Sequence, residues 1–141
     1  NEKYDAIFNL FTSFGYFEDD TDNYKTIKAI HNSLTETGFA VIDFMNVDYV
    51  LENLVADEVK SVDGIDFHIK RYLKDGHIYK EIDFEDKGEK FHFTEKVQAL
   101  RLEDFEKIME EAGIYLLDIF GDYKLRKFFK TQSERLIMIF K

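Results

Sequence analysis

The sequence of 141 residues contains no cysteine, no proline and no tryptophan. Without cysteine, a disulfide framework and any thiolate metal site are excluded. No apolar run approaches the roughly 18 residues that a membrane-spanning helix needs, and no signal-peptide pattern opens the chain. The absence of cysteine fits a reducing compartment, although it fits others too, and we predict a cytoplasmic protein.

Positive charge is also scarce, since 19 Lys and Arg stand against 29 Asp and Glu for a net charge of −10. Phosphate binding is driven mainly by clustered Lys and Arg, so this balance disfavours a nucleic-acid partner. One short basic stretch runs from Lys124 to Lys130. We interpret it as a solvated loop or helix end, with a phosphate or membrane patch as the alternative.

The sequence is rich in aromatic residues, with 15 Phe and 8 Tyr, and its apolar share of 45% is too high for a disordered segment. The length predicts one domain, residues 1–141, with an inserted element. The chain begins at Asn1 and enters an apolar run at Tyr4. Natural domains rarely start so abruptly, so we expect an incomplete domain.

Four short apolar runs predict strands. Runs of this kind, apolar at nearly every position, are typical of sheets that are covered on both faces. They span Tyr4–Phe11, Phe39–Met45, Ile114–Phe120 and Arg135–Phe140.

Two helices are predicted from apolar residues at helical spacing. The first spans about Asp22–Thr37 and the second about Leu102–Ala112, and Gly38 and Gly113 stand where left-handed caps would end them. The first helix joins two predicted strands. Strand–helix–strand units of this length form right-handed crossovers, so these strands should be parallel.

The middle of the chain follows a different pattern. Much of residues 66–100 alternates with period two, and Asp75-Gly76 is a strong hairpin signal. Lys87-Gly88 supplies a weaker second turn. We therefore predict a three-stranded antiparallel meander, residues 65–100, inserted into an α/β fold.

Two-residue turns would fix the register of this meander. Leu73 would face Ile78, and Asp83 would face both His68 and His92. One face would then carry apolar rows and face the core. The rows are Phe67–Phe84–Phe91 and Ile69–Ile82–Phe93.

On the apolar face, the next row holds Arg71, Lys80 and Glu95. Ionisable residues on such a face are costly unless they are paired or hydrated. They form either a salt bridge at the rim of the sheet or a substrate-binding cluster.

The opposite face would hold His68, Asp83 and His92 in one row. These side chains are suitable zinc or iron ligands, but no fourth ligand and no second shell are visible. We therefore predict no metal site.

Segments along nearly the whole chain resemble class I S-adenosylmethionine-dependent methyltransferases that act on small molecules. YDAIFNLFTSFGYF, residues 4–17, resembles the fourth-strand motif of that family. Residues 29–45 resemble the helix and fifth strand that follow, with Asp43 and Asn46 matching the end of this motif. Residues 102–123 resemble the last helix, the sixth strand and a Gly-Asp-Tyr ending, and residues 135–140 the antiparallel seventh strand.

The sequence departs from the family at several points. A Pro-Gly pair is usual before the fifth strand, where this chain has Thr37-Gly38, and a Thr helix cap is usual where it has Arg101. The larger departure is the absence of the glycine-rich loop that holds the cofactor in that family, since nothing in this sequence resembles G-x-G-x-x-G. The resemblance therefore implies the C-terminal part of a methyltransferase domain, a partial Rossmann-like sheet whose final strand is antiparallel. Alone, this part is expected to be inactive.

The resemblance also implies where ligands would bind. Ligands of open α/β sheets lie beyond the carboxyl ends of the strands. The implied contacts to the cofactor S-adenosylmethionine are Asn9, Leu10 and Phe11. The implied substrate contacts are Ser13, Phe14, Tyr16, Asn46 and Tyr123, together with Arg71, Lys80 and Glu95 on a meander that acts as a lid or wall. No catalytic residue is assigned, and Glu95 and Tyr16 are the candidates for a general base.

The function implied is methyl transfer to a small-molecule acceptor. The alternative is a non-catalytic binding or dimerisation module with a methyltransferase-like core. A lone fragment would expose the edge of the strand at Tyr4–Phe11, and an exposed apolar edge favours self-association. We therefore predict a homodimer and no membrane or nucleic-acid partner.

Overall fold

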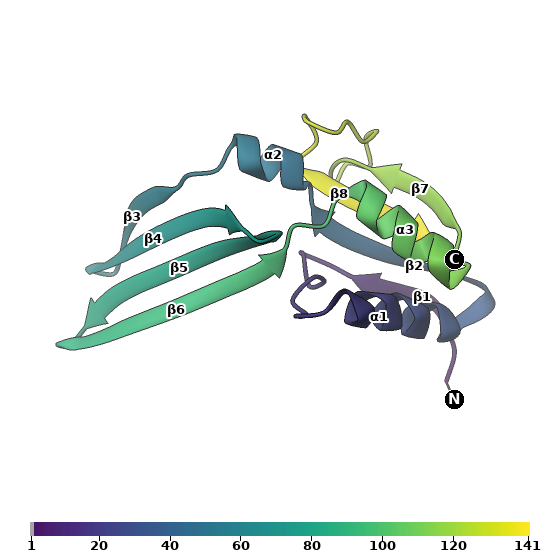
Figure 1. Ribbon diagram of the computed structural model, residues 1–141, viewed down its shortest axis with the longest axis horizontal. Helices are drawn as coiled ribbons and strands as arrows, with labels where there is room; N and C mark the ends of the chain where they lie inside the picture. The colour runs from purple at the N-terminus through teal and green to yellow at the C-terminus, as the bar shows by residue number, and fades with distance from the viewer. Residues whose placement is uncertain (1) are drawn as a thin grey trace. The chain divides into compact units, whose positions relative to one another are not determined.

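The structure is a computed structural model that describes residues 2–141. The chain folds into two four-stranded sheets, and each sheet lies in a separate unit. The first unit holds the chain up to Glu52 and again from Leu100 to Lys141. The second unit is the inserted segment Asn53–Ala99. Figure 1 shows the elements of each unit.

The sheet of the first unit is mixed. Its order is β1 (Tyr4–Asn9), β2 (Leu34–Met45), β8 (Arg135–Phe140) and β7 (Leu116–Phe120). The crossover strands β1 and β2 are parallel, while β8 lies between β2 and β7 and is antiparallel to both. The predicted parallel crossover and antiparallel final strand are therefore confirmed.

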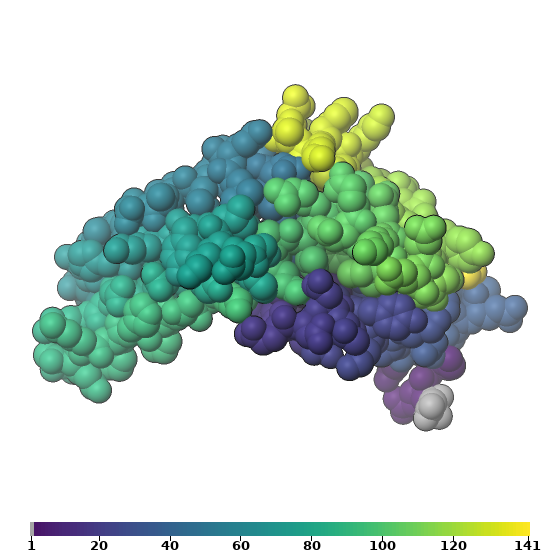
Figure 2. Space-filling view, in the orientation of Figure 1, coloured from purple at the N-terminus to yellow at the C-terminus, as the bar shows by residue number. Residues whose placement is uncertain are grey.

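The core of this unit lies between the sheet and two helices, α1 (Asp20–Asn32) and α3 (Leu102–Ala112). Figure 2 shows these helices side by side on the surface, in purple and green. Under them the ring centroids of Phe44 and Phe105 are 5.3 Å apart, and both side chains are fully buried. On the other face of the sheet Phe8 is 58% exposed. Asp43, further along β2 on that same face, is fully buried. In the described residues, the predicted cover on both faces is therefore complete on the helix side and partial on the other.

The end of the first helix differs from the prediction. Helix α1 ends at Asn32 and is capped by Ser33, and β2 begins at Leu34, which pairs with Tyr4. Pairing with β1 therefore overrides the helical spacing of the following residues. Gly38 lies inside β2 and is no helix cap. A Cβ atom at Gly38 would lie 2.9 Å from the Tyr4 carbonyl oxygen, so glycine permits this close approach of the strands.

The second predicted helix is confirmed. Helix α3 spans the predicted residues, and Gly113 ends it with φ of 69°, in the left-handed conformation. At its start the Asp104 carboxylate accepts a hydrogen bond from the Arg101 backbone N–H at 2.8 Å. This contact serves as the cap in place of threonine. A short helix, α2 (Val47–Glu52), follows β2 and was not predicted.

The inserted unit is an antiparallel meander. Its strands are β3 (Asp57–Val62), β4 (Ile65–Lys74), β5 (His77–Asp86) and β6 (Glu89–Gln98), in that order. The predicted meander is confirmed, with β3 as a fourth strand that the sequence reasoning missed. The turn that joins β3 to β4 is Asp63-Gly64, the same Asp-Gly dipeptide that predicted the turn at Asp75-Gly76 between β4 and β5.

The predicted register of the meander is confirmed. Asp83 pairs with His68 and His92, and Leu73 pairs with Ile78. The apolar face is only partly a core, however. Ile69 is 7% exposed but Phe93 is 53% exposed, because this unit is a single sheet with no helix of its own to cover that face.

Within residues 2–141, none of the helices has the length and apolar character needed to cross a membrane.

Candidate functional site

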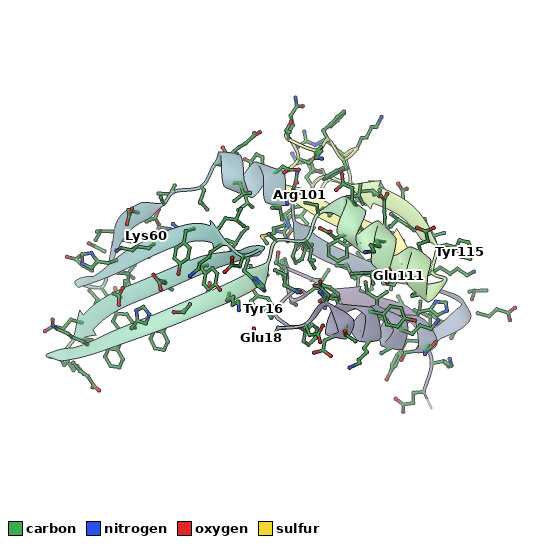
Figure 3. The ribbon with its side chains drawn as sticks, viewed as in Figure 1. Tyr16, Glu18, Lys60, Arg101, Glu111 and Tyr115 are labelled. Atoms are coloured by element: carbon green, nitrogen blue, oxygen red, sulfur yellow. The ribbon has the colours of Figure 1, made fainter. Side chains whose placement is uncertain are left out.

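The strongest candidate site lies at the carboxyl ends of the parallel strands β1 and β2. The segment between β1 and α1 leaves the sheet there and carries several exposed aromatic side chains. Phe11 is 74% exposed and Tyr16 is 57% exposed. Figure 3 labels Tyr16 on this segment. The carboxyl edge of an open α/β sheet is where ligands bind.

The backbone of this segment is strained directly after the strand. Phe11 and Thr12 have φ of 58° and 55°, the left-handed region that residues with a side chain rarely adopt. Each such residue costs roughly 1–2 kcal/mol. Two in succession persist only where the surrounding structure holds them, and such strain is concentrated at functional sites.

The group that holds the turn is the Asp43 carboxylate on β2, which is fully buried. Its Oδ2 accepts hydrogen bonds from the Phe11 backbone N–H and the Tyr123 hydroxyl, each at 2.9 Å. Its Oδ1 accepts one from Arg135 Nε at 2.9 Å. The Thr12 backbone N–H donates to the Asp43 carbonyl oxygen, also at 2.9 Å. The strained turn is therefore tied to β2 by both backbone and side chain.

Arg135 and two aromatic rings complete the arrangement. Arg135 Nη2 donates to Thr12 Oγ1 at 2.9 Å. Its guanidinium lies 5.8 Å from the centre of the Tyr123 ring, within cation–π range. The Tyr123 ring also meets the Phe11 ring edge to face, with centroids 6.2 Å apart. The two rings are held in fixed orientation while both remain largely exposed.

The loop that carries Tyr123 is built by its neighbours. A Cβ atom at Gly121 would lie 2.2 Å from Ser133 Oγ, so only glycine fits there. Burial opposes ionisation of Asp122, but hydrogen bonds from the Arg126 backbone and side chain and the Lys124 backbone outweigh it and lower the pKa of Asp122. The ionised carboxylate closes the turn around Tyr123.

The Tyr123 hydroxyl stays protonated in this setting. Its pKa is raised above the ordinary value of 10.0, first by desolvation and then by its hydrogen bond to the Asp43 carboxylate. A hydroxyl that is held as a donor to Asp43 is unsuited to accept a proton from a substrate.

Asn9, the last residue of β1, and the other residues of the β1–α1 segment lie in two kinds of environment. Asn9 has a buried side-chain oxygen without a hydrogen-bond partner in the described part of the chain. Leu10 is 39% exposed, and its carbonyl oxygen accepts a hydrogen bond from the Ser13 hydroxyl. Phe14 is 1% exposed and packs 5.5 Å from Phe105, so its ring anchors the segment in the core.

Asn46, just beyond β2, is 4% exposed. Its amide Nδ2 donates to the carbonyl oxygens of Lys130 and Ser133, at 2.8 and 2.7 Å. Both donors are therefore committed to the chain that leads into β8. The structure brings Phe11 and Tyr123 into contact, whereas Phe14 and Asn46 are buried against other parts of the first unit.

In the meander, Lys80 pairs across the sheet with both Arg71 and Glu95, as predicted. The three divide into two ion pairs. Arg71 reaches Glu58 on β3 at 3.4 Å, and Lys80 reaches Glu95 at 3.8 Å. The pKa of Glu58 is lowered by its hydrogen bonds to Lys60 and Arg71. The role of Arg71, Lys80 and Glu95 as substrate contacts stays a prediction.

The histidine row of the meander is a local hydrogen-bonded group. His92 Nδ1 lies 2.6 Å from Asp83 Oδ1, and both side chains are about half exposed. Among residues 2–141, no group of three or more His, Cys, Asp or Glu side chains is arranged to hold a metal ion.

Sequence reasoning did not assign Asp43 or Arg135 to the site, although both carried a signal. Each is a charged residue in a predicted strand, Phe39–Met45 or Arg135–Phe140, whose other members are apolar. Opposite charges on two strands that are expected to be buried should be paired.

Comparison with known proteins bears on what this site does. The chain matches no protein-family model. It is 27% identical over 124 residues to a glycine/sarcosine/dimethylglycine N-methyltransferase from Actinopolyspora halophila, covering 86% of this chain and 21% of that protein. It superposes on an S-adenosylmethionine-dependent methyltransferase from Clostridium acetobutylicum with a TM-score of 0.85 and 25% identity, over 100% of this chain and 59% of that one.

The chain has the fold of the C-terminal part of an S-adenosylmethionine-dependent methyltransferase. The CcbJ methyltransferase from Streptomyces caelestis shares this fold, with a TM-score of 0.82 at 12% identity over 99% of this chain and 61% of its own. The resemblance to the C-terminal part of a class I methyltransferase is confirmed. The chain spans about six tenths of these two solved structures and about one fifth of the curated relative.

Proposed function

We propose that this chain supplies the substrate-side part of an enzyme that transfers a methyl group from S-adenosylmethionine to a small-molecule acceptor. The observation that carries the proposal is the strained turn at Phe11 and Thr12, which a buried carboxylate fixes at the carboxyl end of β1. The similarity to S-adenosylmethionine-dependent methyltransferases supports it.

The residues present fit one side of the cofactor. The buried side-chain oxygen of Asn9 lacks a donor among the described residues, and a bound ligand would supply one. The exposed ring of Phe11 suits a positively charged sulfonium, because aromatic faces attract cations. S-adenosylmethionine would supply a methyl group activated on that sulfonium. In this proposal Asn9, Leu10 and Phe11 contact the cofactor.

The acceptor would be bound by the remaining side chains of this edge. Tyr16 and the ring of Tyr123 are exposed and can contact a ligand. Phe14 and Asn46 act by holding the segments in place, since both are buried. In-line methyl transfer depends mainly on positioning and on exclusion of water. The aromatic side chains of this segment suit both tasks.

The proposal is tested by calorimetric titration of S-adenosylmethionine into the complete protein, that is, this chain together with all else that its gene encodes. We expect the complete protein to bind, and residues 1–141 alone to bind far more weakly because they contain no glycine-rich loop. If the complete protein does not bind S-adenosylmethionine, the proposed enzyme function is refuted and a non-catalytic binding or dimerisation module is favoured.

A further inference from the structure

The buried carboxylate of Asp43 does more than neutralise Arg135. Arg135 donates a hydrogen bond to Oδ1, and this contact alone would pair the two charges. The other oxygen, Oδ2, accepts from the Phe11 backbone and from the Tyr123 hydroxyl. These donors stand 32 and 80 residues away in sequence. One carboxylate oxygen therefore joins two loops that the fold brings together.

Both loops present an exposed aromatic ring. The ring of Tyr123 contacts both the Phe11 ring, 6.2 Å away by centroid, and the Arg135 guanidinium, 5.8 Å away. Because the Tyr123 hydroxyl is turned inward to Asp43, the ring is the part of this side chain that remains exposed. The orientation of both rings therefore depends on the same buried oxygen.

The backbone of the turn is strained and depends on contacts such as this one to keep its conformation. Phe11 and Thr12 both carry a side chain and both adopt positive φ, which an unrestrained loop would leave for an extended or right-handed conformation. The Phe11 backbone N–H is bound by the Asp43 side chain, whereas the Thr12 backbone N–H is bound by the Asp43 carbonyl. The side chain thus holds the first residue of the turn and the strand holds the second.

We infer that Asp43 is a positioning residue for the proposed methyl transfer, which holds the Phe11–Thr12 turn in its left-handed form and fixes the aromatic pair Phe11–Tyr123 against the ligand. It touches neither cofactor nor acceptor and acts through these two side chains. The inference rests on the proposed function for its role in the reaction. The effect of Asp43 on the conformation of the turn can be tested by an experiment that does not require methyl transfer.

The first test is amide hydrogen exchange on this chain with Asp43→Ala, which removes both side-chain acceptors and keeps the backbone carbonyl. We expect the Phe11 amide to exchange about tenfold faster or more, as an amide does when it loses its acceptor. The amide of Ile42, on the same strand, should change little. Asp118→Ala, an exposed aspartate on β7, is the matched control and should leave Phe11 unchanged.

Removing Asp43 leaves the half-buried Arg135 without its ion-pair partner, and the single variant could fail to fold for that reason. The double variant Asp43→Ala/Arg135→Leu has no such unpaired charge and keeps the test open. Protection of the Phe11 amide equal to wild type in either folded variant would overturn the inference.

The second test measures binding of S-adenosylmethionine to the complete protein by calorimetric titration. With Asp43→Ala the dissociation constant for S-adenosylmethionine should rise about tenfold or more, whereas Asp118→Ala should change it less than about twofold. An unchanged dissociation constant in a variant with a released Phe11 amide would overturn the role of Asp43 at the ligand site. A wild-type protein that does not bind S-adenosylmethionine would refute the proposed function, whereas the exchange result would still decide what Asp43 does to the turn.

Discussion

At the scale of single residues, the hydroxyl of Tyr123 links the candidate site to pH. Its pKa is raised in the folded chain by desolvation and by the Asp43 carboxylate. A group with a raised folded pKa contributes stability that is complete below the unfolded pKa, near 10.0, and is lost as the pH rises through the folded pKa. The folded chain should therefore lose stability above pH 10, in part through this one residue.

We predict that Tyr123→Phe reduces this alkaline loss. Phenylalanine has no proton to lose, so the free energy of unfolding of the variant should fall less between pH 8 and pH 11 than that of wild type. Urea unfolding at both pH values measures the difference. Tyr115→Phe is the control, because Tyr115 is 74% exposed before β7 and should follow the wild-type profile (Figure 3). Parallel profiles for wild type and Tyr123→Phe would contradict this account.

At the scale of elements, the three hairpin turns of the meander share one conformation. Asp63-Gly64, Asp75-Gly76 and Lys87-Gly88 all have positive φ at both residues, as type I′ turns require. Asp and Asn adopt this conformation readily at the first position, but Lys does not. The third turn is therefore the least favourable of the three.

We predict that Lys87→Asn stabilises the meander. The change should raise its free energy of unfolding by about 0.5 kcal/mol, since asparagine tolerates the left-handed region better than lysine. Hydrogen exchange of β5 and β6 amides measures this directly. Lys90→Asn, which places the same residue in the adjoining strand β6, should give no gain. A loss of stability with Lys87→Asn would show that the lysine side chain contributes more than its backbone strain costs.

Elements with strong local signals were the ones that the sequence predicted well. Helix α3 has an apolar stripe and a glycine cap at Gly113, and the meander register follows from its short turns. Where tertiary pairing decides, local signals fail. Leu34 has the helical spacing yet starts β2, because β1 lies alongside to pair with it.

The candidate site was predictable only in part. Exposed aromatic residues after β1 follow from the sequence, and the structure places Phe11 and Tyr123 together. The roles of Asp43 and Arg135 depend on β2 and β8 being neighbours, although these strands are far apart in sequence. The meander strand β3 was missed despite Asp63-Gly64, because its two apolar residues, Val59 and Val62, are three positions apart and do not alternate. Glu58 and its ion pair with Arg71 were missed with it.

At the scale of the whole molecule, β1 is at one end of its sheet, with a partner on one side only among the described strands. We propose that this edge can pair with a second copy of the chain, since unpaired strand edges favour association. Sedimentation velocity of residues 1–141 should show a dimer, and Phe8→Lys, which adds a charge to the edge, should shift it toward monomer. A wild-type monomer across the micromolar range would contradict the proposal.

The central claim is that the carboxyl edge of β1 and β2 binds S-adenosylmethionine through the segment that Asp43 fixes. Its most direct test compares calorimetric titrations of the complete protein carrying Phe11→Ala or Tyr115→Ala. Both side chains are aromatic and 74% exposed. Strand β7 runs in the same direction as β1 and β2, so Tyr115, which precedes β7, lies at the amino ends of these strands and away from the candidate site. We predict that Phe11→Ala weakens binding about tenfold or more, as loss of a cation–π contact would, and that Tyr115→Ala changes it less than about twofold. Equal affinities for the two variants would contradict the account.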